Sequence, residues 1–210
     1  MLKILIVDDH AVVRAGLKQI LAETPDMKVT GEAGSGTEAL EMALHGSFDL
    51  VLLDISMPDM NGLDVLKELH KEDEALPILM LSMYPEEQYA IRALKAGAKG
   101  YLTKESAPDE LIAAIRKVSQ GGRYISLSLA ENLAFYLGSD SNMSPHQLLS
   151  DREYQVMIMI ASGKTVSEIA DELVLSVKTI STNRHRALQK MGMKNNAEFT
   201  YYAIKEGLVH

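Results

Sequence analysis

Short apolar runs alternate with segments of helical periodicity over roughly the first 122 residues. The runs are rich in Val, Ile and Leu and are too short for buried helices, so we expect strands there. These strands are predicted at 2–7, 28–33, 49–54, 77–82 and 99–102. In the segments between, apolar residues recur every three or four positions, which predicts helices at 11–22, 36–45, 62–71, 86–96 and 108–120. Five strand–helix units are typical of a parallel sheet with crossover helices, a doubly wound (βα)₅ α/β fold.

The first predicted helix illustrates the pattern, because its apolar residues are expected on one buried side. They are Val12, Val13, Leu17, Ile20 and Leu21. Gly97 is expected to end the fourth helix, and Pro108 suits the first turn of the fifth, where its missing N–H costs nothing.

The last third of the chain shows helical patterns and no strand pattern. A connecting helix is predicted from the apolar positions Leu127, Leu129, Leu133, Ala134 and Leu137. A polar linker follows at 138–147, and further helices are predicted at 151–162, 166–173, 177–190 and 196–206. We therefore divide the chain into an α/β domain at 1–122, a connecting helix and linker at 123–147, and a small all-α domain at 148–210.

Composition is that of a soluble globular protein, with 47% hydrophobic and 24% charged residues among 210. No apolar run approaches the roughly 18 residues of a membrane span, and there is no cysteine. We expect a cytoplasmic protein without membrane contact. The net charge of −8 is concentrated in residues 1–125, whereas residues 145–210 carry eight basic against seven acidic side chains. Composition alone therefore does not indicate nucleic-acid binding in the second domain.

Polar side chains follow successive predicted strands, where ligands bind in parallel sheets. They are Asp8, Asp9, Asp54, Ser82 and Lys104. Clustered carboxylates repel one another and suit a hard divalent cation, and an ionised Asp can accept a phosphoryl group. Taken singly, each has a simpler interpretation, such as a helix cap for the Asp pair or a solvated lysine. Together at consecutive strand ends, they favour a phosphate-and-metal site.

Residues 1–122 resemble the receiver domain of two-component response regulators. The resemblance is carried by VDDH at 7–10, LDISMPDMNG at 53–62, Ser82 and GYLTK at 100–104. It implies that Asp54 is the phosphoacceptor and that Mg²⁺ (or Mn²⁺) is held by Asp8, Asp9, Asp54 and the backbone carbonyl of Ser56. Lys104 would then pair with the phosphoryl group, with Ser82 and Tyr101 as the switch pair. A sensor histidine kinase is the implied phosphoryl donor.

Two positions depart from the wider receiver pattern. Glu105 stands where many receivers have a proline, so a cis peptide after Lys104 is in doubt. Met83 stands where many receivers have a small residue, and we expect its bulk to narrow access to Asp54. By chemistry alone, an aromatic residue on a last strand, such as Tyr101, is more often a half-buried packing residue than a switch residue. Only the resemblance favours a switch role for Tyr101.

The all-α domain contains two short helices at 166–173 and 177–190 separated by a three-residue turn, which suits a helix-turn-helix. Upstream, Ser150 and Glu153 form a capping-box pattern. In the second of the two helices, the inward side is expected to hold Ile180, Ala187, Leu188 and Met191. The outward side would hold Lys178, Ser181, Thr182, His185, Arg186 and Gln189, which is basic and hydrogen-bonding, as a major-groove helix requires. The pattern alone leaves open an ordinary helix bundle with a solvated charged face.

Residues 148–209 resemble the LuxR-type helix-turn-helix of NarL/FixJ response regulators. The matching pieces are LSDRE at 149–153, GK at 163–164, EIA at 168–170, LS at 175–176, KTI at 178–180 and KM at 190–191. The resemblance implies base contacts from Ser181, Thr182 and His185. It implies phosphate contacts from Lys178, Thr179, Arg184, Arg186 and Lys190. Along the last helix, Ala197, Tyr201 and Ile204 would line a dimer interface or belong to the core.

Together these features predict a phosphorylation-controlled, DNA-binding transcriptional regulator of a two-component system. It would not be an enzyme beyond slow loss of its own phosphoryl group. We expect it to dimerise on activation and to bind an inverted-repeat operator in double-stranded DNA. A haloacid-dehalogenase-like phosphatase is the enzyme alternative, but those enzymes carry a second Asp where Ser56 stands here. The second alternative is a degenerate receiver that acts as a constitutive DNA-binding or protein-interaction module. The presence of all three carboxylates, Asp8, Asp9 and Asp54, argues against it.

Overall fold

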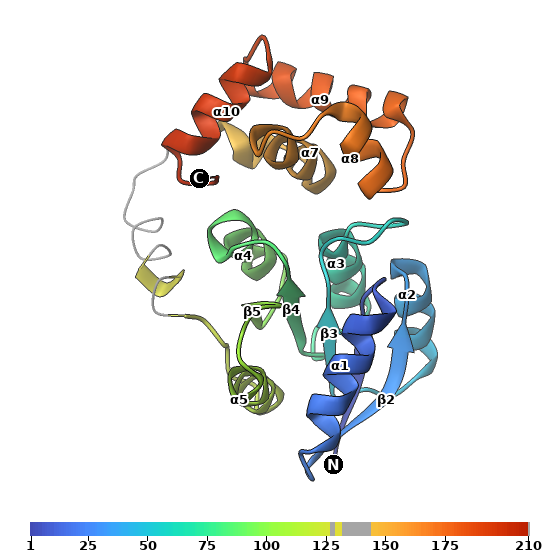
Figure 1. Cartoon of the computed structure of the whole chain (residues 1–210). Helices are drawn as coiled ribbons and strands as arrows, with labels where there is room; N and C mark the ends of the chain where they lie inside the picture. The colour runs from blue at the N-terminus through green and yellow to red at the C-terminus, as the bar shows by residue number, and fades with distance from the viewer. Residues whose placement is uncertain (127–128, 132–143, 210) are drawn as a thin grey trace. The chain divides into compact units, whose positions relative to one another are not determined.

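The computed structural model describes residues 1–126, 129–131 and 144–209 (Figure 1). The chain divides into two compact units, Met1–Glu131 and Asn132–His210.

The first unit is built on a five-stranded sheet in which all neighbouring strands are parallel, in the order β2-β1-β3-β4-β5. The strands are β1 (Leu2–Val7), β2 (Met27–Ala33), β3 (Leu50–Leu53), β4 (Ile78–Ser82) and β5 (Gly100–Thr103). Each lies within one residue of its predicted bounds. Strand β2 lies on one side of β1, and β3, β4 and β5 follow on the other side. This change of direction is typical of doubly wound sheets. The predicted fold class is confirmed.

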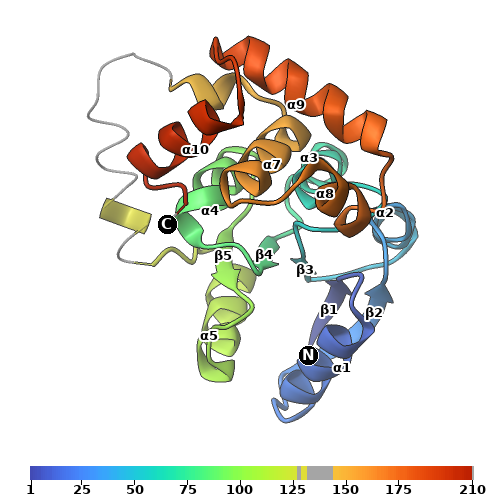
Figure 2. The same cartoon turned by 45° about the horizontal axis from the view of Figure 1, so that its top comes forward.

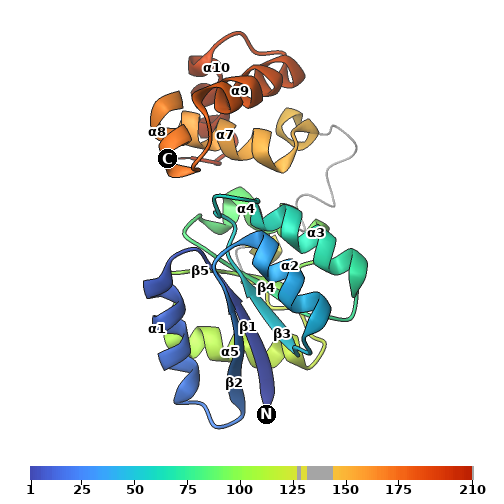
Figure 3. The same ribbon diagram turned by 90° about the vertical axis from the view of Figure 1, so that its right-hand side faces the viewer.

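Helices cover both faces of this sheet. They are α1 (Ala11–Ala22), α2 (Gly36–His45), α3 (Gly62–Glu72), α4 (Glu86–Lys95) and α5 (Pro108–Ser119). Leu17 and Leu21 of α1 share one hydrophobic core with Leu111 and Ile115 of α5, so these two helices lie on the same face. Figure 3 shows α1 on one side of the strands, with α2 and α3 on the other.

The prediction for Val12 is wrong, because its side chain is 85% exposed. Leu17 and Leu21 form the buried side of α1, with Val13 and Ile20 half-buried beside them. A helix advances about 100° per residue, so the position before Val13 turns away from the sheet.

The first unit extends past the boundary predicted at residue 122. Tyr124 forms a bridge to Gly100 beside β5, and its N–H donates to Lys99 O over 2.8 Å. Leu129, in a short helical stretch, is 1% exposed. The other positions of the predicted connecting helix, Leu127, Leu133, Ala134 and Leu137, lie outside the described residues.

The second unit is helical over the part that the structure describes. It contains a 3₁₀ turn η1 (Pro145–Leu148) and α7 (Asp151–Ala161), α8 (Val166–Glu172), α9 (Val177–Met191) and α10 (Asn196–Lys205) (Figure 2). Ser150 and Glu153 cap α7 reciprocally, as predicted. Helix α7 packs against α9 and α10, and its residues from Tyr154 to Ala161 are all buried. In neither unit does a described helix have the length and apolar character to span a membrane.

Candidate functional site

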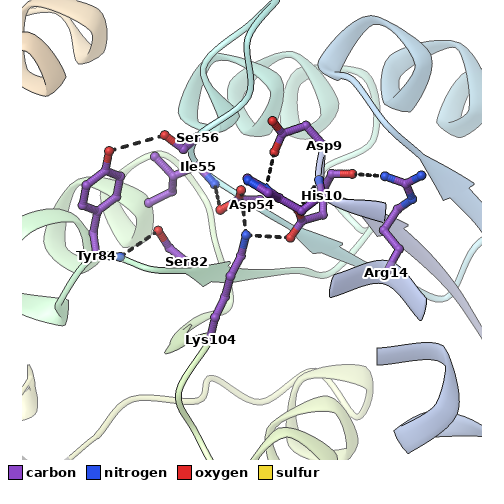
Figure 4. Close-up of polar contacts among 10 residues, drawn as sticks. Asp9, His10, Arg14, Asp54, Ile55, Ser56, Ser82, Tyr84 and Lys104 are labelled. Carbon is purple, nitrogen blue, oxygen red and sulfur yellow. Dashed lines mark hydrogen bonds and ion pairs between the residues drawn. The ribbon is translucent and has the colours of Figure 1, made fainter. Parts of the chain in front are cut away.

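The candidate acceptor site lies at the carboxyl edge of the sheet. Asp8 follows β1 and Asp54 follows β3, and these strands are neighbours that pair Val7 with Leu53. Ser82 is the last residue of β4, and Lys104 directly follows β5. Because parallel strands end at one edge, residues that are distant in sequence meet there (Figure 4).

Lys104 joins the two buried carboxylates. Its Nζ lies 2.6 Å from Asp8 Oδ2 and 2.9 Å from Asp54 Oδ2. Burial raises the pKa of Asp54 to about 6, against the opposing pull of the Lys104 charge. For Lys104, burial favours the neutral amine, but the two carboxylates outweigh it and raise its pKa. Asp54 is therefore mostly ionised at neutral pH, in a site that desolvates its charge.

The site has the donor set for a divalent cation. One ligand atom from each of Asp8, Asp9, His10 and Asp54 lies within 4.8 Å of the others. Asp9 Oδ1 and Asp54 Oδ2 are buried carboxylate oxygens, paired with His10 and with Lys104 respectively. Carboxylates held this close together repel one another, and a bound cation would relieve that repulsion. The residues present fit a divalent metal.

Two residues near the acidic pair were missed as site residues. His10 Nδ1 lies 2.8 Å from Asp9 Oδ1, and the N–H of His10 donates to Asp8 Oδ1 over 2.9 Å. Arg14, one turn into α1, donates from its guanidinium to the carbonyl oxygen of Asp8 over 2.6 Å. Both residues lie close to Asp8 in the sequence, which could have pointed to them. However, neither a histidine nor an arginine by itself indicates an acidic site.

The predicted switch residues both bind the backbone of Tyr84. Ser82 Oγ accepts a hydrogen bond from Tyr84 N over 3.2 Å, and Tyr101 Oη donates to Tyr84 O over 2.7 Å. Tyr101 is fully buried, and burial raises its pKa. The Tyr84 hydroxyl in turn lies 3.4 Å from Ser56 Oγ. Tyr84, to which no sequence motif pointed, is the common partner of these residues.

The structure describes both positions that depart from the receiver pattern, Glu105 and Met83. The peptide between Lys104 and Glu105 is trans. Met83 is 64% exposed, so its side chain points largely to solvent.

Helix α9 has the two sides that its sequence predicts. Ile180, Ala187, Leu188 and Met191 are buried. The outward set Lys178, Ser181, Thr182, His185, Arg186 and Gln189 is exposed, as predicted. A shallow hollow of about 270 Å³ runs along this helix, lined by Lys178, Thr179, Thr182, Asn183 and Arg186. The exposed surface of α9 is therefore cationic and hydrogen-bonding, which suits a nucleic-acid backbone and base edges.

Two predicted phosphate contacts already have partners within the domain. Lys190 Nζ lies 2.6 Å from the buried Glu153 carboxylate. Burial alone would raise the pKa of Glu153, but Lys190 and Ser150 outweigh it and lower that pKa. Arg184 is half-buried and donates from Nε to Asn196 Oδ1 at the start of α10. Both side chains thus tie α9 to its neighbours.

The residues predicted for dimerisation share the exposed side of α10. Tyr201 is 73% exposed and Ile204 57% exposed, and Ala197 is exposed as well. They do not belong to the core, which takes Phe199 and Ala203 from this helix.

Two family models match the chain, one in each unit. The response regulator receiver domain matches residues 4–116, and the luxR family of bacterial regulatory proteins matches residues 147–203.

Relatives match over nearly the full length. The chain is 38% identical to the response regulator UvrY of Escherichia coli strain K12 over 99% of this chain and 96% of UvrY. It is 36% identical to the response regulator GacA of Pseudomonas aeruginosa over 100% of this chain and 98% of GacA. A solved structure of RcsB from Salmonella enterica serovar Typhimurium, bound to the rprA promoter with a phosphomimetic, is 27% identical. It covers 96% of this chain and 97% of that chain, with a TM-score of 0.67. The chain therefore belongs to the NarL/FixJ response regulators, two-component transcription regulators that join a receiver domain to a LuxR-type DNA-binding domain.

Proposed function

We propose that Asp54 accepts a phosphoryl group from a sensor histidine kinase and that this modification controls operator binding by residues 148–210. The observation that carries the proposal is the convergence of Asp8, Asp54 and Lys104 at the carboxyl edge of the sheet. An oxygen of the ionised Asp54 carboxylate attacks phosphorus, and the bond from phosphorus to the donor imidazole breaks. The imidazole leaves with the electron pair and takes up a proton, while Asp54 becomes an acyl phosphate.

The residues around Asp54 supply charge and position. Lys104 neutralises negative charge on the incoming phosphoryl oxygens, since its ammonium is already held beside Asp54. Asp8 and Asp9, with the Ser56 carbonyl, would hold Mg²⁺ (or Mn²⁺), which when bound shields phosphoryl oxygens from the carboxylates. We expect loss of the phosphoryl group from Asp54 to be slow.

Phosphorylation would be communicated through the Ser82 hydroxyl. This hydroxyl now accepts from the Tyr84 N–H, and it can donate to a phosphoryl oxygen on Asp54. The added charge of about −1.5 to −2 shifts the conformational equilibrium only through such state-dependent contacts. The loop that contains Tyr84 leads directly into α4, so the change is expected to reach the surface there.

On DNA, we propose a homodimer that places two α9 helices in major grooves of an inverted-repeat operator. The exposed residues Ser181, Thr182 and His185 would contact bases, with Lys178, Thr179 and Arg186 on phosphates. The side of α10 formed by Ala197, Tyr201 and Ile204 is the proposed contact between the two copies. Half-site centres would lie about 34–36 Å apart, or a multiple of that. We propose that the protein acts in the cytoplasm.

The acceptor proposal is tested by treating the full chain with acetyl phosphate and Mg²⁺ and measuring its intact mass. We expect the mass of one phosphoryl group to be added to the wild type and to Asp59→Asn, but not to Asp54→Asn. Asp59 is a suitable control because it is exposed and contacts the start of α2 instead of Lys104. Labelling of Asp54→Asn at the wild-type level would refute the assignment.

The control of DNA binding is tested with duplexes selected from a random pool. We expect an inverted repeat and tighter binding when beryllofluoride, a phosphoryl mimic, is present with Mg²⁺. Equal affinity with and without beryllofluoride would refute control by the receiver while leaving DNA binding intact.

A further inference from the structure

His10 brings a nitrogen donor to an otherwise all-oxygen site. Its ring Nδ1 lies 2.8 Å from Asp9 Oδ1 and 3.3 Å from Asp8 Oδ1. In Figure 4 His10 lies beside Asp9, on the side of Asp54 away from Ser82. The ring has solvent access, since its side chain is 65% exposed, so it can turn without disturbing the core.

These distances fit neighbouring ligands of one metal ion. For metal–ligand bonds of about 2.1 Å, adjacent vertices of an octahedron are about 3.0 Å apart. The Nδ1 distances of 2.8 Å and 3.3 Å bracket that value. The Asp9 oxygen nearest to Nδ1 is a buried atom, and His10 Nδ1 is its partner. Asp54 Oδ2 is buried as well, in a side chain that is 2% exposed, and it pairs with Lys104.

The chemistry of the donors then determines which ions the site favours. Carboxylates, carbonyls and water suit Mg²⁺, whereas imidazole adds affinity for first-row transition ions such as Co²⁺ and Zn²⁺. We propose that His10 is a metal ligand of this site and raises its affinity for borderline transition ions over Mg²⁺. The inference rests on the divalent-cation site of the proposed function, and it adds a ligand and an ion preference to that site.

The experiment compares Co²⁺ and Mg²⁺ binding to the full-length protein by isothermal titration calorimetry. His10→Ala removes the donor, and His45→Ala is the matched control, since His45 is an exposed histidine of the same domain that contacts Glu41 O in α2. We expect His10→Ala to weaken Co²⁺ about tenfold or more while Mg²⁺ changes less than about twofold. The ratio of the two dissociation constants is the decisive quantity, because a general change in site charge affects both ions.

A spectroscopic readout distinguishes ligation from a purely electrostatic effect. Pulsed electron paramagnetic resonance of the Mn²⁺-loaded protein should show coupling to an imidazole nitrogen in wild type and His45→Ala, and none in His10→Ala. Calorimetric melting of the metal-free variants checks that each is folded. If Mg²⁺ binds and His10→Ala leaves the ratio unchanged, the role of His10 is overturned while the proposed site stands. If the wild type binds neither ion, the divalent-cation site of the proposed function fails as well.

Discussion

Replacing Asp54 by Asn should stabilise the metal-free receiver, with an effect that grows as the pH rises. Burial raises the pKa of Asp54 from 3.8 to about 6 even with Lys104 beside it. A carboxyl with a higher pKa in the folded state binds more protons there than in the unfolded chain. Its ionisation therefore costs stability, beginning above the unfolded value near pH 4 and complete above about pH 7. An amide cannot ionise, so Asp54→Asn resembles the protonated carboxyl at every pH.

The magnitude follows from the shift. About two pKa units at 1.36 kcal/mol each amount to about 3 kcal/mol at pH 7.5, and to less than about 1 kcal/mol at pH 4. For a domain of this size, 3 kcal/mol corresponds to a rise in melting temperature of about 10 °C. The Asn side chain keeps the oxygen that accepts from the Ile55 N–H over 2.8 Å, while Lys104 keeps its contact with Asp8.

The assay is differential scanning calorimetry of the full-length protein in EDTA between pH 4 and pH 8, with the receiver transition identified by its response to added Mg²⁺. Asp59→Asn is the control of opposite sign. Although burial acts to raise the pKa of Asp59, hydrogen bonds from Thr37 and Gly36 lower it overall. Asp59 thus stabilises the fold above its unfolded pKa, and this stability is lost as the pH falls. Equal melting temperatures for wild type and Asp54→Asn at pH 7.5 would refute the reasoning.

Further predictions concern Lys190, with Lys178 for comparison, and then Val174 and Ser126. Lys190→Gln should leave the salt dependence of DNA binding unchanged and lower the stability of the second unit by about 1–2 kcal/mol, because its ammonium pairs with Glu153. Lys178→Gln, by contrast, should reduce the slope of log affinity against log salt by about 0.9, and equal slopes for the two variants would contradict this. Val174 has a φ of 51° although it is β-branched, so Val174→Asn should raise the stability of the second unit by about 1 kcal/mol in urea unfolding. Ser126→Ala should speed amide exchange at 129–131, because Ser126 Oγ accepts from Leu129 N and donates to Glu86; unchanged exchange would show that this contact does not hold the segment.

The sheet, its helices and the acceptor cluster could be predicted from sequence because each follows from a short-range pattern. Strand ends converge in any parallel sheet, so Asp8, Asp54 and Lys104 are brought together by topology without detailed packing. Val12 was misplaced for the opposite reason, since a one-residue shift in helical phase depends on how α1 packs against the sheet. Which of two adjacent valines faces inward is a tertiary property.

Pairings between distant side chains were not available from the sequence. Lys190 and Glu153 are 37 positions apart, and no local pattern shows that a cation on a predicted recognition helix is paired with a buried carboxylate. Tyr124 likewise reads as the start of a linker, yet it pairs with Gly100 at the edge of β5. Gly100 permits this approach, because a side chain there would place its Cβ 2.8 Å from Tyr124 O. Long-range contacts of this kind require the fold.

We propose that long-range contacts also carry a small event at Asp54 to the segment that leads out of the receiver. Tyr84 is held through its N–H by Ser82 and through its carbonyl by Tyr101. Two residues later, Glu86 opens α4 and accepts a hydrogen bond from Ser126. Ser82 and Tyr101 stand on buried strands, so the loop between Ser82 and Glu86 is the part free to adopt a second arrangement. A hydroxyl has one proton. When Ser82 donates it to a phosphoryl oxygen on Asp54, that proton is no longer available to any other acceptor near Ser82. We infer that this choice biases the loop and, through Glu86, the anchoring of Ser126 and Leu129, a coupling that needs no movement of the sheet.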